Sequence, residues 1–99
     1  MVQIDLPPTL KDLDVSNNNL VHLPEHLPPK LIVLRCYKNN LTSLPENLPR
    51  TLRLLITCKN KIPSLPELHN LNYLFAYDNP LLLLPNNPVV YYHENLSLK

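Results

Sequence analysis

The stretch LIVLRCYKNNL, residues 31–41, contains the pattern that decides the fold of this chain. Leucine stands at its first, fourth and eleventh positions, a small residue at the sixth and asparagine at the ninth. The same frame, with an apolar or small residue at the sixth position and leucine or isoleucine at the eleventh, occurs in LKDLDVSNNNL (10–20), LRLLITCKNKI (52–62) and LNYLFAYDNPL (71–81), so that the four copies follow one another at offsets of 21, 21 and 19 residues. Self-similarity at such a period indicates a repeat architecture, in which each unit buries its apolar side by stacking on its neighbours.

Alternating apolar residues around the second leucine of each copy predict a short strand, and stacked copies predict a parallel sheet. The residues that we expect to face inward are Leu10, Leu13, Val15 and Leu20; Leu31, Leu34, Cys36 and Leu41; Leu52, Leu55, Thr57 and Ile62; and Leu71, Leu74, Ala76 and Leu81. A Leu-Pro pair follows each copy, and proline removes a backbone donor and restricts the preceding residue. The segments between the strands are therefore predicted to be extended or polyproline-like, with no long helix.

The asparagine at the ninth position, which is Asn18, Asn39, Asn60 or Asn79, is predicted to be structural. Its amide offers two donors and an acceptor to backbone groups that lose their ladder partners where the chain leaves the strand. The chain has no glycine. We therefore expect asparagine to occupy the turn positions that need a positive φ angle.

The frame, together with the phrases LPEHLPPKL (23–31) and LPENLPRTL (44–52), resembles leucine-rich repeat proteins over about residues 6–85. The short, proline-marked units are similar to those of type III secreted bacterial effectors. The resemblance implies a horseshoe of the α/β class, with strands on the concave side and extended or 3-10 segments on the convex side. The implied single domain spans residues 1–99, with repeats at about 6–26, 27–47, 48–67 and 68–86.

The ends of the chain depart from this pattern. Residues 87–99 are expected to form a cap and tail, with 89–92 as an extra strand-like segment against the fourth repeat. The effectors often carry a helical cap and a ubiquitin-ligase domain beside their repeats. Neither is present in these 99 residues, so we expect no ligase activity.

Strand alternation places a second set of side chains on the concave face of the predicted sheet. Four of the six aromatic residues belong to this set, and an outward apolar block is typical of an interface. We predict a non-enzymatic module that binds a protein partner there. The predicted binding residues are the apolar anchors Tyr37, Leu54, Ile56, Tyr73, Phe75 and Tyr77, with Asp12, Asp14 and Arg35 setting the orientation. Two alternatives are a homodimer that buries the same face and cross-strand pairs that only stabilise the sheet.

Composition excludes several other functions. A formal net charge of +1 favours neither nucleic acid nor an acidic membrane, and no apolar run approaches the roughly 18 residues of a membrane span. Without glycine, phosphate loops and dinucleotide folds are excluded, and we expect no cofactor. Exposed charges that recur between copies, namely Glu25, Glu46 and Glu67 and the pair Lys38 and Lys59, are interpreted as solubilising.

The histidines and cysteines predict no catalytic or metal site. His22 and His26 are separated by Pro24, so they would not share a helical face for a metal. Cys36 is expected to point inward and Cys58 outward, which prevents a disulfide and leaves Cys58 as the accessible thiol, without a histidine beside it. The start of the chain lacks the pattern of a secretion signal, and there are no cysteine-clustered caps. We therefore expect an intracellular, cytoplasmic location, which for an effector or viral protein means the host cytoplasm.

Overall fold

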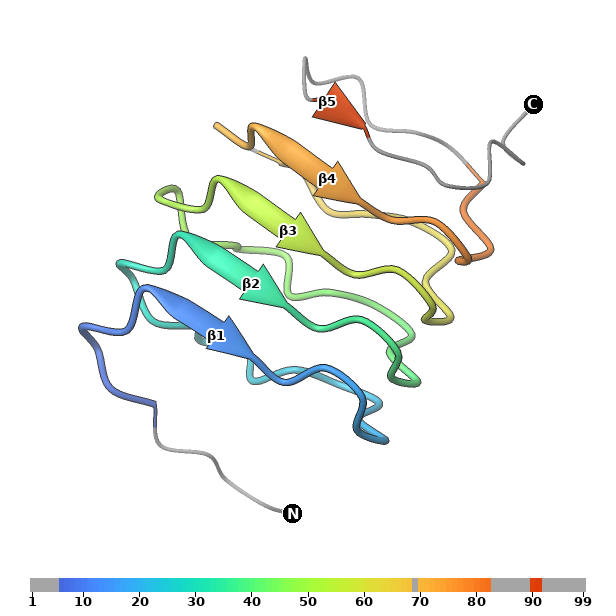
Figure 1. Cartoon of the computed structure of the whole chain (residues 1–99), viewed down its shortest axis with the longest axis horizontal. Helices are drawn as coiled ribbons and strands as arrows, with labels where there is room; N and C mark the ends of the chain where they lie inside the picture. The colour runs from blue at the N-terminus through green and yellow to red at the C-terminus, as the bar shows by residue number, and fades with distance from the viewer. Residues whose placement is uncertain (1–5, 69, 83–89, 92–99) are drawn as a thin grey trace.

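The computed structural model describes residues 6–68, 70–82, 90 and 91. They form one parallel sheet (Figure 1) of β1 (Asp12–Asp14), β2 (Val33–Arg35), β3 (Leu54–Ile56), β4 (Tyr73–Phe75) and β5 (Val90–Tyr91). The strands lie in sequence order, each paired only with its neighbours, so the sheet is open. No helix occurs in the described residues. The predictions of short parallel strands and of no long helix are confirmed for this part of the chain.

The register of the sheet follows the sequence frame. Leu13 pairs with Leu34, Leu34 with Leu55, and Leu55 with Leu74, so the second leucine of every copy lies at the same height. The last pairing joins β4 to β5, which confirms a strand-like segment at 90 and 91; residues 89 and 92 lie outside the described residues.

Backbone pairing continues past the three-residue strands. The amide of Cys36 donates to the carbonyl of Ile56 at 2.8 Å, and the amide of Lys38 donates to the carbonyl of Cys58 at 3.0 Å. The same step recurs one turn earlier and one turn later along the sheet. Adjacent turns are therefore held together from the strand up to the residue that precedes the frame asparagine.

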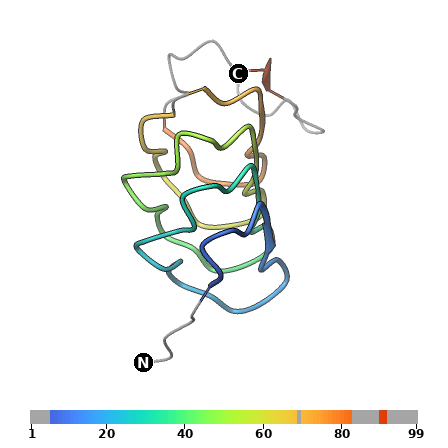
Figure 2. The ribbon, with the colours of Figure 1, turned by 90° about the vertical axis from the view of Figure 1, so that its left-hand side faces the viewer.

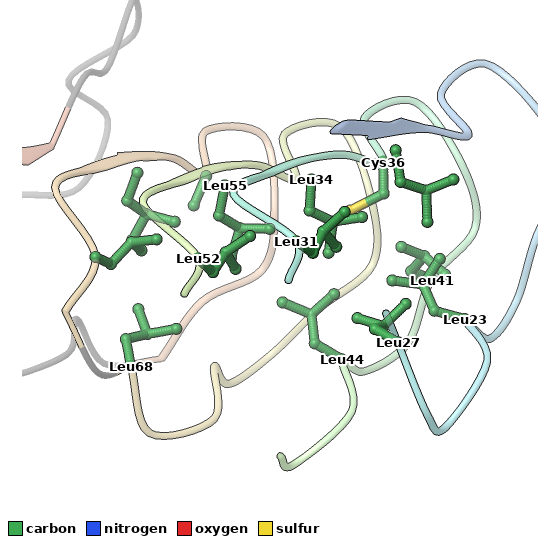
Figure 3. Packing of buried hydrophobic residues seen from close by; sticks show 14 of the residues in the cluster. Leu23, Leu27, Leu31, Leu34, Cys36, Leu41, Leu44, Leu52, Leu55 and Leu68 are labelled. Atoms are coloured by element: carbon green, nitrogen blue, oxygen red, sulfur yellow. The ribbon is translucent and has the colours of Figure 1, made fainter. Parts of the chain in front are cut away.

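The connections between β1 and β4 return on one side of the sheet, as Figures 1 and 2 both show. Leucines of the sheet and of the connections point toward one another in the space between (Figure 3), as Leu34 and Leu44 illustrate. All the inward positions of the two middle copies are at most 2% exposed. The half-buried inward residues are those of the outer turns: Leu10, Val15, Leu20 and Leu81. The inward set is thus confirmed, and burial of each leucine contributes about 1.5–3 kcal/mol.

The frame asparagines join neighbouring turns. The Oδ1 atom of Asn39 accepts hydrogen bonds from the amides of Asn18 and Leu20, at 3.1 and 3.2 Å. Its Nδ2 atom donates to the carbonyls of Val15 and Cys36, both at 3.1 Å. Asn60 and Asn79 repeat this bridge to the preceding turn. The predicted structural role is confirmed for Asn39, Asn60 and Asn79, whereas the side chain of the exposed Asn18 bonds to carbonyls of its own turn and, among the described residues, bridges to no other turn.

The residue before each frame asparagine adopts a left-handed conformation. Asn17 has a φ angle of 59°, but its counterparts are Lys38 and Lys59, both at 58°, and Asp78 at 57°. Asn70 is a further positive-φ residue. The prediction that asparagine would take these positions is therefore correct at two residues and wrong at Lys38, Lys59 and Asp78. The turn is imposed by the amide of the next asparagine, which must reach the carbonyls two and three residues before it.

Candidate functional site

The face of the sheet opposite the connections is the candidate site, and we call it the outer sheet face. In the register of the sheet it contains two rows that cross the strands. The first row is Asp12, Val33, Leu54 and Tyr73, and the second is Asp14, Arg35, Ile56 and Phe75. A third row, two residues beyond the strands, is Ser16, Tyr37, Cys58 and Tyr77. Neighbouring strands lie about 4.8 Å apart, so each row is continuous.

Charged side chains occupy the outer sheet face over β1 and β2. Arg35 contacts Asp12 diagonally, with Nε 3.4 Å from Oδ1, rather than Asp14 directly opposite in the register. The two side chains are 40% and 53% exposed, so water screens the pair and it contributes at most about 1 kcal/mol. Asp14 instead accepts a hydrogen bond from the amide of Ser16 at 3.0 Å.

The environment of Asp14 keeps it ionised. The Ser16 amide, and next the Ser16 hydroxyl, hold the pKa of the Asp14 carboxyl below its ordinary value, with a smaller contribution from the charge of Arg35. Because Arg35 is already engaged by Asp12, this end of the outer sheet face has one negative charge in excess. It is therefore a poor surface for an anion.

Apolar side chains cover the same face over β3 and β4 and, at Tyr37, just beyond the end of β2. We call this set the apolar patch: Tyr37, Leu54, Ile56, Tyr73, Phe75 and Tyr77. Tyr73 is 44% exposed and Tyr37 38%, and the other four are partly buried. All nine residues that the sequence predicted for binding therefore lie together on one face of the sheet. Their role in binding stays a prediction.

Cys58 differs from the sequence prediction. It occupies the outward third row, but it is only 4% exposed, so the expectation of an accessible thiol is wrong. Backbone pairing places Cys58 between Tyr37 and Tyr77 on the adjacent turns, and these larger side chains flank the small cysteine. Burial raises the pKa of Cys58 despite a hydrogen bond with Tyr77.

The other cysteine is equally unsuited to act as a nucleophile. Cys36 is fully buried in the core, and this burial raises its pKa to about 11. Both cysteines are free, as predicted. A thiolate is the reactive form of cysteine, and both sites disfavour it.

The described residues contain few other chemical groupings. Within 6–68, 70–82, 90 and 91, no three His, Cys, Asp or Glu side chains come together in a way that would hold a metal ion. In the same part of the chain, no helix is long and apolar enough to cross a membrane.

A concentration of positive charge was missed by the argument from net charge. Residues 30–61 contain seven of the nine Lys and Arg residues and one of the eight Asp and Glu residues, a local formal charge of seven minus one, or +6. We call these seven residues the basic band: Lys30, Arg35, Lys38, Arg50, Arg53, Lys59 and Lys61. Arg35 lies on the outer sheet face, and the other six are exposed before or after β2 and β3. The signal was present in the order of the charges, and acidic residues in the flanking parts of the chain cancel it in the total.

Comparison with known proteins identifies no relative: no protein-family model matches the chain, and no curated protein matches it significantly.

Proposed function

We propose that this protein is a non-enzymatic leucine-rich-repeat module that binds a protein partner through the outer sheet face. Support for the repeat class comes from the four copies of the sequence frame, from strands paired in the order of those copies, and from the asparagine that bridges each turn to the one before. In such a solenoid the outer sheet face is the concave side. The domain would run through residues 1–99, with the repeat boundaries expected from the sequence.

The observation that carries the binding proposal is the apolar patch. A sheet face turned to water ordinarily holds polar side chains, yet Tyr73 is 44% exposed and lies beside Leu54 and Phe75 in the sheet. A contiguous apolar surface of this kind is typical of an interface, and aromatic residues often dominate the binding energy there. Tyrosine suits this role because its ring buries a large apolar area while its hydroxyl keeps a polar contact.

The proposal includes an intracellular location. Two unpaired cysteines in a small domain fit a reducing compartment, where thiols stay reduced. We do not assign nucleic acid or membrane lipid as a partner, and the burial of both thiols argues against a nucleophilic enzyme.

A pair of substitutions on the patch tests the proposal. Ile56→Ser with Phe75→Ser removes two neighbouring apolar side chains that are only partly buried. The matched control is Val21→Ser with Leu82→Ser, which removes two apolar side chains that are 48% and 81% exposed and lie outside the outer sheet face. Circular dichroism establishes that both variants fold.

Candidate partners retained from a cell lysate are purified, and their dissociation constants are measured with each variant. Loss of two anchor side chains at about 1–2 kcal/mol each weakens binding by roughly 30-fold to 1,000-fold. The control variant binds like the wild type. A partner that binds both variants equally well would show that the patch is not the binding surface.

The same variants separate the homodimer alternative. Sedimentation over a concentration series gives the mass of one chain for a module that binds a foreign protein. A mass of two chains that returns to one in Ile56→Ser, Phe75→Ser would instead assign the patch to self-association.

A further inference from the structure

The basic band frames the apolar patch at both ends of the central strands. Arg53 directly precedes Leu54, the first residue of β3, and Lys59 and Lys61 follow the end of the same strand. Lys38 follows Tyr37 one turn earlier. A partner that covers the part of the apolar patch formed by Tyr37, Leu54 and Ile56 must therefore come close to several cations.

Lys38 and Lys59 differ from the rest of the basic band in their backbone conformation. Both hold φ angles of 58°, in the left-handed region that lysine seldom occupies. Asn17 occupies the same position in the first turn, so the fold accepts asparagine there, and asparagine tolerates a positive φ angle better than lysine does. An unfavourable conformation held by the surrounding structure is a reason to look for function.

The backbone of each lysine is fixed against the next turn. The Lys38 amide donates to the carbonyl of Cys58 at 3.0 Å, and the Lys59 amide donates to the carbonyl of Tyr77 at 2.9 Å. The two lysines therefore lie on adjacent turns, about 4.8 Å apart along the sheet. Among the described residues the ion pair formed is that of Arg35 with Asp12, so neither lysine is within ion-pair distance of a carboxylate there, although Asp78 occupies the position next to Lys59 on the following turn.

We propose that the partner recognised by the outer sheet face is an acidic, apolar protein segment. Its apolar side chains cover the apolar patch, and its carboxylates contact Lys38 and Lys59 at the carboxyl ends of β2 and β3. This inference rests on the proposed function and specifies the chemistry of its partner.

The acidic residues on either side of the band limit the length and nature of that segment. Asp12 and Asp14 lie on the first turn, and Asp78 follows β4. The cations of the band thus span two turns, and a long polyanion would continue onto repulsive carboxylates on both sides.

The probe is a displayed library of random peptides of about 12 residues, which at about 3.3 Å per extended residue are long enough to cross the sheet. The wild-type protein selects binders, and their composition is compared with that of the unselected library. We expect enrichment of Asp and Glu together with apolar residues. Enrichment of basic or uncharged apolar peptides, or of none, overturns the inference.

Selected peptides are then synthesised and measured against variants. Lys38→Asn with Lys59→Asn removes both charges and installs a residue that suits the left-handed conformation. The matched control, Lys11→Asn with Lys99→Asn, removes the same charge from outside the band. Two exposed ion pairs at the usual strength predict binding that is roughly two- to thirtyfold weaker in the first variant, less so at high salt, and unchanged in the control.

The outcomes distinguish this inference from the proposed function. Binding that depends on Ile56 and Phe75 but not on Lys38 and Lys59 keeps the interaction surface and overturns the acidic partner. Binding of acidic peptides that ignores Ile56→Ser, Phe75→Ser overturns both. A fluorescent oligothymidylate that competes for the same lysines with equal or better affinity would identify a nucleic-acid surface and also overturn the inference.

Discussion

Replacement of Asn39 by alanine is expected to destabilise the protein far more than the same change at Asn18. The Asn39 side chain makes five hydrogen bonds, all to backbone groups, and four of them are 3.1–3.2 Å long. Of the five backbone groups that it bonds, two carbonyls lie on its own turn, and two amides and one carbonyl lie on the turn before. Asn18 donates two bonds, both within its own turn, and it is exposed.

The magnitude follows from the number of bonds lost. At about 0.5–1.5 kcal/mol for each net hydrogen bond, four bonds correspond to roughly 2–6 kcal/mol. Water enters part of the vacated space, because the amides of Asn18 and Leu20 are only partly buried. We therefore expect Asn39→Ala to lower the free energy of unfolding by about 3 kcal/mol, and Asn18→Ala by about 1 kcal/mol.

Urea unfolding followed by circular dichroism measures both changes. With a denaturant slope of about 1.5 kcal/mol per molar, a loss of about 3 kcal/mol moves the midpoint down by about 2 M. Domains of this size have little stability in reserve, so Asn39→Ala is expected to approach the unfolding limit. Asn40→Ala, an exposed neighbour, serves as the control and should leave the midpoint within the error of the measurement.

The decisive result is the difference between the urea midpoint shifts of the variants. Equal midpoint shifts for Asn39→Ala and Asn18→Ala would show that the bridge between turns adds nothing beyond the local turn. A shift at Asn39 no larger than that of the exposed Asn40 would refute the structural role of the asparagines altogether.

Three further changes test separate features. The Thr57 hydroxyl is buried, and in the described part of the chain it meets the Cys36 thiol, a weak hydrogen-bonding group, so Thr57→Val should raise the free energy of unfolding by up to about 1 kcal/mol in a urea titration; a loss would mean that the bond with the thiol outweighs the cost of burying the hydroxyl. Lys38→Asn with Lys59→Asn should raise the melting temperature, because asparagine tolerates a φ angle of 58° better, with a gain of a few tenths of a kcal/mol at each site. The folded state keeps the Cys36 proton up to a pKa of about 11, above the ordinary value of 9.0, so stability is full below pH 9 and falls as the pH rises toward 11. Cys36→Ala should remove this part of the decline, about 2–3 kcal/mol over the interval, and an unchanged slope would contradict the burial of the thiol.

The outer sheet face shows how far sequence reasoning reaches toward the site. Alternation along a strand is a local property, so it correctly placed Leu54 and Phe75 on the face opposite the core. The contacts of Arg35 are not local, because a long side chain can reach a diagonal neighbour as easily as the residue opposite. It contacts Asp12, while Asp14, which is opposite in the register, accepts a hydrogen bond from the Ser16 amide.

The basic band illustrates a different limit. Every charge in it can be read from the sequence, but a total of +1 conceals a segment of +6. Its relation to the apolar patch depends on the register that brings Lys38 and Lys59 onto adjacent turns beside Tyr37. The grouping therefore becomes visible when the charges are placed on the sheet.

The sequence by itself predicted the short parallel strands, their order and their register, because each copy repeats its apolar positions and its asparagine at nearly the same spacing. The tertiary structure alone decided how deeply a residue is buried where its surroundings come from other turns. Cys58 is buried between tyrosines of the adjacent turns, and the side chain of Asn39 is buried where it bonds to backbone groups of the preceding turn. Burial of this kind depends on neighbours distant in the chain, and no local pattern records it.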